Sequence, residues 1–337
     1  MNDLPERIDT LEQLEFAAKG YQLSRLILTA AELDVFTALD REPLGAERLA
    51  FRLGTHPRAT GMLLNALAGV HLLEKKDGVF HCGACAARHL SADSPEDKRA
   101  VFLHGAQLWE SWSTLTACVR HGHRAGQFER KERNESDLRS FIGAMHAYGL
   151  EQAEAFVEQL ERKGACRILD LGGGPGIYAI TFCRTWPGAR ATLFDRAPVL
   201  EIAGEHLAES GVGDRIDTIG GDMIEDDLGG PYDLVWLSNV AHSFAPQRVR
   251  LLFRKIHDVL LPGGRFLVRD FVLSPDGTQP AFAALFALNM LVNTPGGDSY
   301  TYDQYAFWLD EAGFEDVHLN EAEVPGSTRV IEARRPE

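Results

Sequence analysis

An acidic residue stands directly before a glycine-rich turn in the middle of the chain, in the stretch "LDLGGGPG". The residues of this motif are Asp170, Gly172, Gly173, Gly174 and Gly176. Glycine permits both a tight backbone turn and the close approach of a ligand. A dinucleotide fingerprint would need a glycine where Ile177 stands, and the turn has no Lys or Arg for a phosphate. The motif therefore predicts a site for a nucleoside without phosphates, whose positive charge Asp170 helps to balance.

Two further acids occupy comparable places later in the chain. Asp195 ends the stretch "ATLFD", where a carboxylate can accept both hydroxyls of a ribose. Asp222 follows the next apolar stretch in "GGDM", where it can bind the exocyclic amine of adenine while Met223 packs on the ring. Each acid alone is more often a helix cap or a turn residue. Three of them at successive strand ends, beside a glycine turn, indicate a nucleoside site.

The segments that must position these acids alternate between apolar strands and amphipathic helices. We expect strands at 167–171, 191–195, 215–219, 232–238 and 265–273, and helices at 176–184, 198–210 and 246–260. This alternation predicts an α/β fold, a Rossmann-like doubly wound parallel sheet with helices on both faces. One more helix and a C-terminal antiparallel hairpin complete it. Ligands of such sheets bind at the carboxyl ends of the strands.

The N-terminal part is predicted to be an all-helical module that contains a winged helix. Two short helices, 46–52 and 58–70, are followed by a hairpin around Gly78. DNA binding is one alternative, but the candidate recognition helix offers only Arg58 as a cation. A packing or dimerisation role is favoured. We predict three parts, which are a dimerisation domain (1–95), a helical linker with substrate-pocket helices (96–160) and a cofactor-binding catalytic domain (161–337).

Charge and composition exclude several classes of function. The 337 residues carry a formal net charge of −15, which argues against a surface built for nucleic acid. No apolar run reaches the roughly 18 residues that a membrane helix needs, and the N-terminal residues lack the order of a signal peptide. We therefore expect a cytoplasmic protein that binds neither membrane nor nucleic acid, with its five cysteines reduced.

One motif offers a zinc site as an alternative. Cys82 and Cys85 form a C-x-x-C pair, with His81 and His89 on either side. A structural zinc site normally supplies two such pairs. We therefore predict no metal.

The order and spacing of several motifs resemble a known family, the class I S-adenosylmethionine-dependent methyltransferases. These motifs are "LDLGGGPG", "GGDM", "SNVAHSF", "LPGGRFLVRDFVL", "LNMLVNTPGGDSYT" and "WLDEAGF". The closer resemblance is to dimeric O-methyltransferases related to plant caffeate, animal acetylserotonin and bacterial natural-product enzymes. It implies S-adenosylmethionine as cofactor, a small-molecule acceptor, and a homodimer whose N-terminal module helps to close the partner's active site. The cofactor-binding residues predicted are Asp170, Gly172, Gly173, Gly174, Gly176, Asp195, Asp222, Met223 and Ser238.

Two residues are candidates for catalysis. A hydroxyl acceptor must lose its proton, and histidine is the usual base near neutral pH. In the resembled family a histidine just past the fourth parallel strand is the general base, and His242 in "NVAHSF" occupies this place. Asp270 in "VRDF" occupies the place of a carboxylate that orients this histidine. The alternative for His242 is a surface or capping residue.

The chain also departs from the plant relatives at two places. They follow the histidine with Asp-Trp, where this chain has Ser243-Phe244. They place a second orienting glutamate where this chain has Ser299, with Asp298 beside it. The same fold hosts S- and C-methyltransferases, so these remain alternatives to O-methylation, as does a ligand-sensing regulator that uses the winged helix.

The acceptor pocket is expected among helices outside the strand–helix alternation. The candidates are Phe141, Met145, His146, Asn289, Met290 and Asn293. Ordinary core packing is an equal alternative for the apolar members. The polar members, on otherwise apolar helices, are possible anchors for the acceptor.

Overall fold

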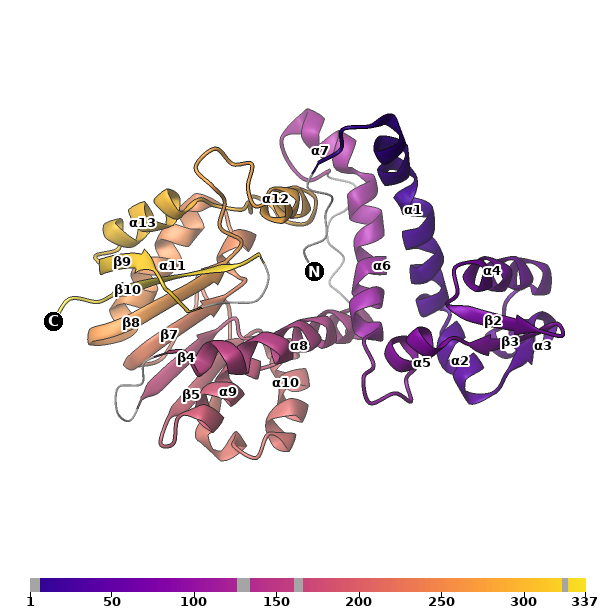
Figure 1. Cartoon of the computed structure of the whole chain (residues 1–337). Coiled ribbons are helices and arrows are strands. Elements are labelled where there is room, and N and C mark those ends of the chain that lie inside the picture. Colours follow the sequence, from indigo (N-terminus) through magenta and orange to yellow (C-terminus); the bar gives the residue numbers. More distant parts are fainter. Residues whose placement is uncertain (1–6, 126–133, 161–165, 323–326) are drawn as a thin grey trace. The chain divides into compact units, whose positions relative to one another are not determined.

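The structure is a computed structural model that describes residues 7–125, 134–160, 166–322 and 327–337 (Figure 1). The described chain divides into two compact units. The smaller unit comprises residues 7–109 and 134–144, and the larger one comprises the other described residues. The predicted boundaries of the three parts stay a prediction.

The smaller unit contains the predicted winged helix. Its elements are α1 (Leu11–Glu32), α2 (Val35–Arg41), β1 (Leu44–Gly45), α3 (Ala46–Leu53), α4 (Pro57–Gly69), β2 (Leu73–Lys76), β3 (Val79–Cys82) and α5 (Ala84–Leu90). Thr10 begins α1 with a capping box, because its side chain accepts from the backbone N–H of Gln13. Gly54 ends α3 in the left-handed conformation, at φ +65°. The three strands form a sheet in the order β1-β3-β2, which confirms the helix–turn–helix and wing.

Two long helices contribute residues to both units. They are α6 (Arg99–Ser113) and α8 (Glu135–Val157). The short α7 (Leu115–His121) belongs wholly to the larger unit. Consequently Phe141 lies in the smaller unit, whereas Met145 and His146 lie in the larger one.

A mixed seven-stranded sheet forms the centre of the larger unit. Its strands are β4 (Arg167–Leu171), β5 (Arg190–Asp195), β6 (Ile216–Gly220), β7 (Tyr232–Ser238), β8 (Leu260–Asp270), β9 (Glu315–Leu319) and β10 (Arg329–Arg334). The order is β6-β5-β4-β7-β8-β10-β9, with β4 to β8 parallel and β10 antiparallel to both neighbours. The predicted doubly wound sheet and closing hairpin are confirmed. The strand order reverses between β4 and β7, and such a switch point opens a crevice at the carboxyl edge.

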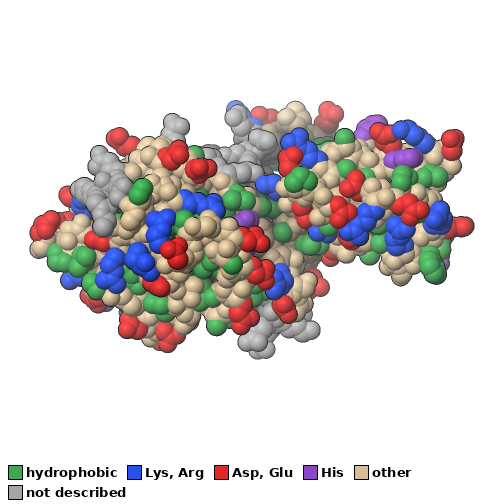
Figure 2. All heavy atoms as spheres, turned by 90° about the horizontal axis from the view of Figure 1, so that it is seen from below, with side chains coloured by type: hydrophobic (Ala, Val, Ile, Leu, Met, Phe, Trp, Pro, Cys, Tyr) green, Lys and Arg blue, Asp and Glu red, His purple; other side chains and the backbone are tan. Residues whose placement is uncertain are grey.

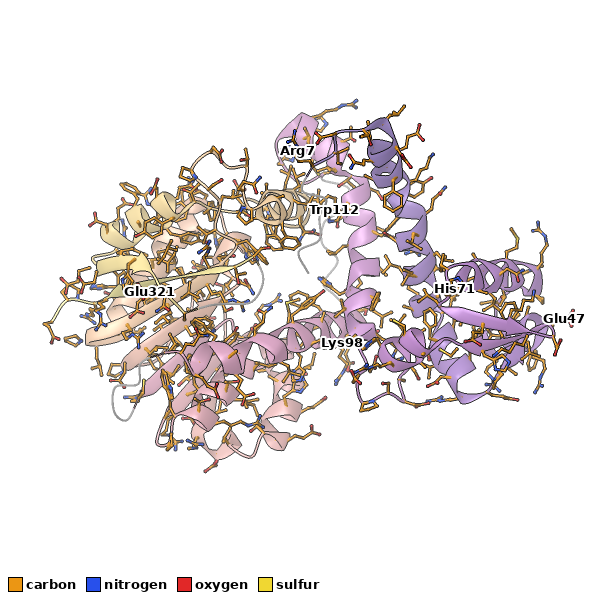
Figure 3. The ribbon with its side chains drawn as sticks, in the orientation of Figure 1. Arg7, Glu47, His71, Lys98, Trp112 and Glu321 are labelled. Atoms are coloured by element: carbon orange, nitrogen blue, oxygen red, sulfur yellow. The ribbon has the colours of Figure 1, made fainter. Side chains whose placement is uncertain are left out.

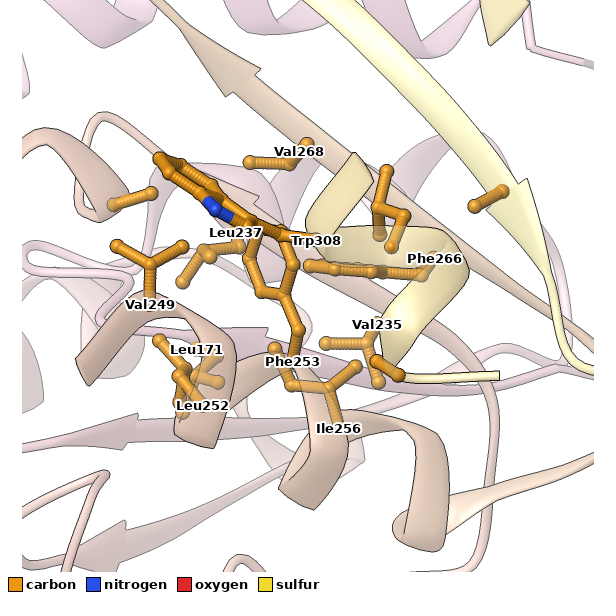
Figure 4. Close-up of a cluster of buried hydrophobic side chains, with 14 of the residues drawn as sticks. Leu171, Val235, Leu237, Val249, Leu252, Phe253, Ile256, Phe266, Val268 and Trp308 are labelled. Carbon is orange, nitrogen blue, oxygen red and sulfur yellow. The ribbon is translucent and has the colours of Figure 1, made fainter. Parts of the chain in front are cut away.

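Helices cover both faces of this sheet (Figure 1). On one face lie α9 (Ile177–Thr185) and α10 (Ala197–Glu209) with part of α8, and on the other lie α11 (Pro246–Val259) and α13 (Tyr302–Glu311). Helix α12 (Ala281–Asn293) follows β8 in the chain. The alternation of side chains along β4 separates two cores. Leu169 and Leu171 join one core, with α11 and α13 (Figure 4), whereas Ile168 joins the other, with α8, α9 and α10.

The predicted strand 265–273 is wrong at both ends. Strand β8 begins at Leu260, because Gly263 and Gly264 exchange backbone hydrogen bonds with Arg335 of the C-terminal segment. It ends at Asp270, and beyond it the Leu273 N–H donates to the carbonyl of Tyr300 at 2.9 Å. Contacts between residues distant in sequence therefore set both ends of this strand.

The charges do not gather into a basic surface on the winged helix. Arg48 and Arg52 both pair with Glu42, at 3.2 and 2.5 Å. Figure 2 shows acidic and basic side chains intermixed over the face that it presents. None of the helices in the described ranges has the length and apolar character needed to span a bilayer.

Candidate functional site

The glycine turn lies at the carboxyl end of β4, where the backbone must enter α9. Gly172 adopts φ +69°, and a Cβ there would lie 2.8 Å from Cγ2 of Val240 and 3.0 Å from Cε of Met223. A Cβ on Gly173 would lie 2.5 Å from Cγ of Asp170. Side chains of the protein itself therefore exclude larger residues here, in addition to any ligand. The same contacts place Met223 and Val240 against the turn.

Asp170 is buried beneath this turn, with 1% of its surface exposed. Its Oδ2 accepts the backbone N–H of Ala179 at 2.9 Å, while its Oδ1 has no hydrogen-bond partner among the described residues. Burial raises the pKa of Asp170 to about 7, opposed by the N–H of Ala179 and assisted by the charge of Asp195. An unsatisfied buried carboxylate oxygen is costly. A cationic ligand at this turn would relieve that cost, which fits the predicted cofactor.

Asp170→Asn should stabilise the ligand-free protein at pH 8, by about 1–3 kcal/mol. The folded pKa of Asp170 is about 7 and its ordinary value is 3.8, so the folded state holds this proton more tightly. The contribution of Asp170 to stability therefore falls as the pH rises from about 4 to about 7. Denaturant unfolding of both proteins at pH 5 and pH 8 measures the effect. The variant should exceed the original protein in free energy of unfolding by less at pH 5 than at pH 8. An equal difference at both pH values would contradict the raised pKa of Asp170.

Asp195 joins the turn from the neighbouring strand. Its Oδ2 accepts the N–H of Gly174 at 2.9 Å, and its Oδ1 accepts the N–H of Arg196 at 2.7 Å. Burial raises the pKa of Asp195, and these two N–H groups oppose the shift. The structure thus brings the first two predicted acids to one turn.

The remaining predicted cofactor residues lie at the same edge of the sheet. Asp222 is exposed after β6, and its Oδ1 accepts the N–H of Ile224 at 2.8 Å, so it also stabilises its own turn. Ser238 ends β7 and is half-buried. Their roles toward a ligand stay predictions.

His242 and Asp270 form a buried pair. His242 lies in the short 3-10 helix η2 (Ala241–Ser243) after β7, and Asp270 ends β8. The Nδ1 of His242 lies 2.6 Å from Oδ1 of Asp270, and the backbone N–H of His242 donates to Oδ2 at 3.0 Å. Because an ionised carboxylate only accepts, Nδ1 carries the proton and Nε2 is left as a basic nitrogen. Burial would raise the pKa of Asp270, but the charge and hydrogen bonds of His242 outweigh it, so the pKa lies below its usual value.

Tyr305 is a third member of this group, and no sequence motif indicated it. The hydroxyl of Tyr305, on α13, donates to Oδ2 of Asp270 at 3.0 Å, and Tyr305 is fully buried. The backbone N–H of Asp298 donates to the carbonyl of His242 at 2.9 Å. The Oγ of Ser299 is buried and has no partner within the described ranges. The residue beside the expected second acid, Asp298, therefore holds the backbone of His242.

Aromatic rings form a wall beside His242. The ring of Phe286, on α12, lies 4.8 Å from that of His242 in an edge-to-face arrangement. Phe271 lies 4.2 Å from Phe286. Such a wall can exclude water and contact a flat apolar ligand.

Two predicted pocket residues continue the same face of α12. The Oδ1 of Asn289 accepts from Nε1 of Trp112 (labelled in Figure 3) and from Nδ2 of Asn293, both at 2.9 Å. The indole N–H can only donate, and Nδ2 of Asn293 also donates to the carbonyl of Asn289. Both amide orientations are thereby fixed. Met290 is buried on the same helix.

The other predicted pocket residues have different surroundings. The ring of His146 stacks on that of His206, from α10, at 4.1 Å. Met145 is half-buried on α8, and the ring of Phe141 lies 5.2 Å from that of His104 in the smaller unit. The structure thus groups only the α12 residues with His242, and the pocket role of all six residues stays a prediction.

The C-x-x-C motif gives no metal centre in the described chain. Cys85 is exposed, and burial raises the pKa of Cys82 to about 12. Throughout the described ranges, no three His, Cys, Asp or Glu side chains are grouped so as to hold a metal ion.

Comparison with known proteins gives matches over almost the whole chain. A family profile described as "O-methyltransferase domain" matches residues 112–315, and one described as "O-methyltransferase dimerisation domain" matches residues 17–92. The tetracenomycin polyketide synthesis 8-O-methyl transferase TcmO of Streptomyces glaucescens is 31% identical over 330 residues, 96% of each chain. The 3-hydroxy-5-methyl-1-naphthoate 3-O-methyltransferase of Streptomyces sahachiroi is 31% identical over 319 residues, covering 93% of this chain and 92% of the relative.

A solved structure agrees with these matches. The crystal structure of human N-acetylserotonin methyltransferase in complex with S-adenosylmethionine is 25% identical, with a TM-score of 0.82. The match covers 99% of this chain and 100% of the human one. The similarity therefore extends over both matched domains.

Proposed function

Because the chain belongs to the O-methyltransferase family, we propose that it transfers the methyl group of S-adenosylmethionine to a hydroxyl group of a small aromatic molecule. Dependence on S-adenosylmethionine and enzymatic activity follow from the family. The observation that carries the choice of a hydroxyl acceptor is the buried His242–Asp270 pair, with 2.6 Å between Nδ1 and Oδ1.

The residues of the glycine turn fit S-adenosylmethionine. The buried, unpartnered Oδ1 of Asp170 suits its positive charge, and Asp195 suits its ribose hydroxyls. In this proposal Asp222 binds the exocyclic amine of the adenine, and Met223, which lies against the turn, packs on the ring. When bound, the cofactor supplies an electrophilic methyl group on a sulfonium. The contribution of the protein is to hold the acceptor in line with that methyl group in a dry site.

His242 removes the proton of the acceptor hydroxyl. Its Nδ1–H is held by Asp270, which leaves Nε2 to accept the proton. The imidazolium formed is stabilised by the ionised Asp270, whose lowered pKa keeps it charged. The Val240 contact with the glycine turn brings the segment before His242 beside the cofactor site.

The aromatic character of the acceptor is supported by Phe271 and Phe286. The two amides of α12 add a polar end to this wall. The contacts described above use Oδ1 of Asn289 and Nδ2 of Asn293, which leaves Nδ2 of Asn289 and Oδ1 of Asn293 for other partners. These groups suit a second oxygen substituent on the acceptor. Two of the relatives, an 8-O-methyl transferase of polyketide synthesis and a naphthoate 3-O-methyltransferase, are consistent with such a molecule.

A panel of acceptors tests this proposal. The purified protein is incubated with S-adenosylmethionine and with phenols, naphthols, aliphatic alcohols, thiols and carbon nucleophiles of similar size. We expect release of S-adenosylhomocysteine with hydroxylated aromatics, and a methyl ether in the product. Release with thiols alone, or methylation at carbon, would contradict O-methylation and favour the S- or C-methyltransferase alternative.

We further propose that the protein is a homodimer. The matched dimerisation domain begins at residue 17, within α1, and this helix exposes several large apolar side chains along its length. They are Leu11, Leu14, Phe16, Tyr21 and Leu23. Exposed apolar side chains of this size on one helix are typical of a contact with a partner.

Phe16→Glu should convert the dimer to a monomer at micromolar concentration. Phe16 is 79% exposed in the single chain, so the substitution removes little packing within it. Burying a charge in the interface costs more than burying the ring. Light scattering during size-exclusion chromatography measures the mass. Glu12→Gln on the same helix is the control, and an unchanged mass for Phe16→Glu would place the interface elsewhere.

A further inference from the structure

Asp270 receives four hydrogen bonds, and one of them comes from outside the catalytic segments. Three donors are the Nδ1–H and backbone N–H of His242 and the backbone N–H of Phe271. The fourth is the hydroxyl of Tyr305, 35 residues further along the chain. Oδ2 is shared between this hydroxyl and the backbone of His242, while Oδ1 faces the imidazole.

The hydroxyl of Tyr305 is held firmly in place. Thr301 and Gln304 start α13 with a reciprocal capping box. The ring of Tyr305 then packs edge-to-face against Tyr300 and Trp308. Burial and the negative charge of Asp270 raise the pKa of Tyr305 well above its usual value. The hydroxyl therefore stays protonated and donates a hydrogen bond to Asp270.

We propose that Tyr305 is a positioning residue for the base, acting through Asp270. This inference rests on the proposed function of His242. The donated hydrogen bond fixes the plane of the Asp270 carboxylate, and it also draws negative charge away from the oxygen that faces His242. The neutral hydroxyl of Tyr305 therefore weakens the attraction between Asp270 and the protonated ring of His242.

The other titratable groups around the pair make different contacts. Tyr300 donates its hydroxyl to the carbonyl of Phe244 at 2.5 Å, and its pKa is raised by burial and by the charges of Asp298 and Asp270. Asp298 is exposed, and its carboxylate accepts the N–H of Ser299. Phe271 and Phe286 complete the surroundings of His242 with uncharged rings. Tyr300 is therefore a matched control in the same aromatic cluster.

Tyr305→Phe removes one oxygen atom and keeps the ring contacts. Deleting the donor concentrates negative charge on Asp270, so His242 holds its proton to higher pH. We expect the acidic limb of the pH–rate profile to move up by about 0.5–1 unit. The rate should fall about threefold to tenfold near neutral pH and recover at higher pH, because a shift of one unit changes the fraction of free base by up to tenfold. A purely structural defect would instead lower the rate at every pH.

The titration of the His242 ring, followed by NMR with labelled histidine, provides a readout independent of turnover. The His242→Asn spectrum identifies its signal among the 12 histidines. A shift to higher pH in Tyr305→Phe but not in Tyr300→Phe supports the proposal. No difference between the two variants in this titration overturns it. If the ring titration moves while the pH–rate profile does not, the role of Tyr305 stands and the assignment of His242 as the base fails.

Discussion

His242→Asn should lower kcat by about 10²–10⁴-fold, the usual contribution of a general base. Asparagine is chosen because its side-chain N–H can still donate to Asp270, which is 1% exposed and would otherwise keep an unpaired charge. The basic nitrogen at Nε2 is lost, so the acceptor hydroxyl must ionise unaided. The rate of S-adenosylhomocysteine release, with the acceptor found in the panel, measures the loss. Affinity for S-adenosylhomocysteine, measured by calorimetry, should be unchanged.

The pairing with Asp270 provides a second test of the same mechanism. Asp270→Asn removes the carboxylate that fixes the Nδ1–H tautomer. Because both residues act as one unit, the double variant should be little slower than His242→Asn alone. If the loss of kcat in the double variant equalled the product of the two single losses, the two residues would act independently. Full activity of His242→Asn would exclude this residue as the base.

The secondary structure that positions the site could be predicted because it depends on local patterns. Apolar runs of strand length and stripes of helical period are properties of neighbouring residues. The ends of β8 could not be predicted, because Arg335 and Tyr300 set them from distant parts of the chain. The first and second acids of the nucleoside site could be placed, because strand ends in a parallel sheet share one edge.

Residues that act through partners distant in sequence have no local sequence pattern that indicates their role. Tyr305 has the spacing of an ordinary core aromatic on an amphipathic helix, and only the fold brings its hydroxyl to Asp270. The same holds for Trp112, which fixes the amide of Asn289 from 177 positions away. The glycine turn is an intermediate case. Its flexibility is readable from sequence, whereas the closeness of Val240 to Gly172 is not.

Asp195→Ala should weaken the binding of S-adenosylhomocysteine by about 10–100-fold, the loss expected for hydrogen bonds to a charged group. Two effects combine in this substitution. The ribose would lose its carboxylate acceptor, and the N–H of Gly174, which donates to Asp195 at 2.9 Å, would lose the partner that braces the turn. Calorimetric titration of the purified protein measures the dissociation constant directly and needs no acceptor.

Asp233→Ala is the matched control for this measurement. Asp233 also accepts a backbone N–H across the sheet, from Arg167 at 2.7 Å, but it lies at the opposite end of β4 from the glycine turn. Both variants lose a carboxylate that braces the backbone, and only Asp195→Ala should lose ligand affinity. A comparable loss of ligand affinity in both variants would mean that general loosening of the sheet causes the loss in Asp195→Ala. Unchanged affinity in Asp195→Ala would show that the ribose is held by other residues.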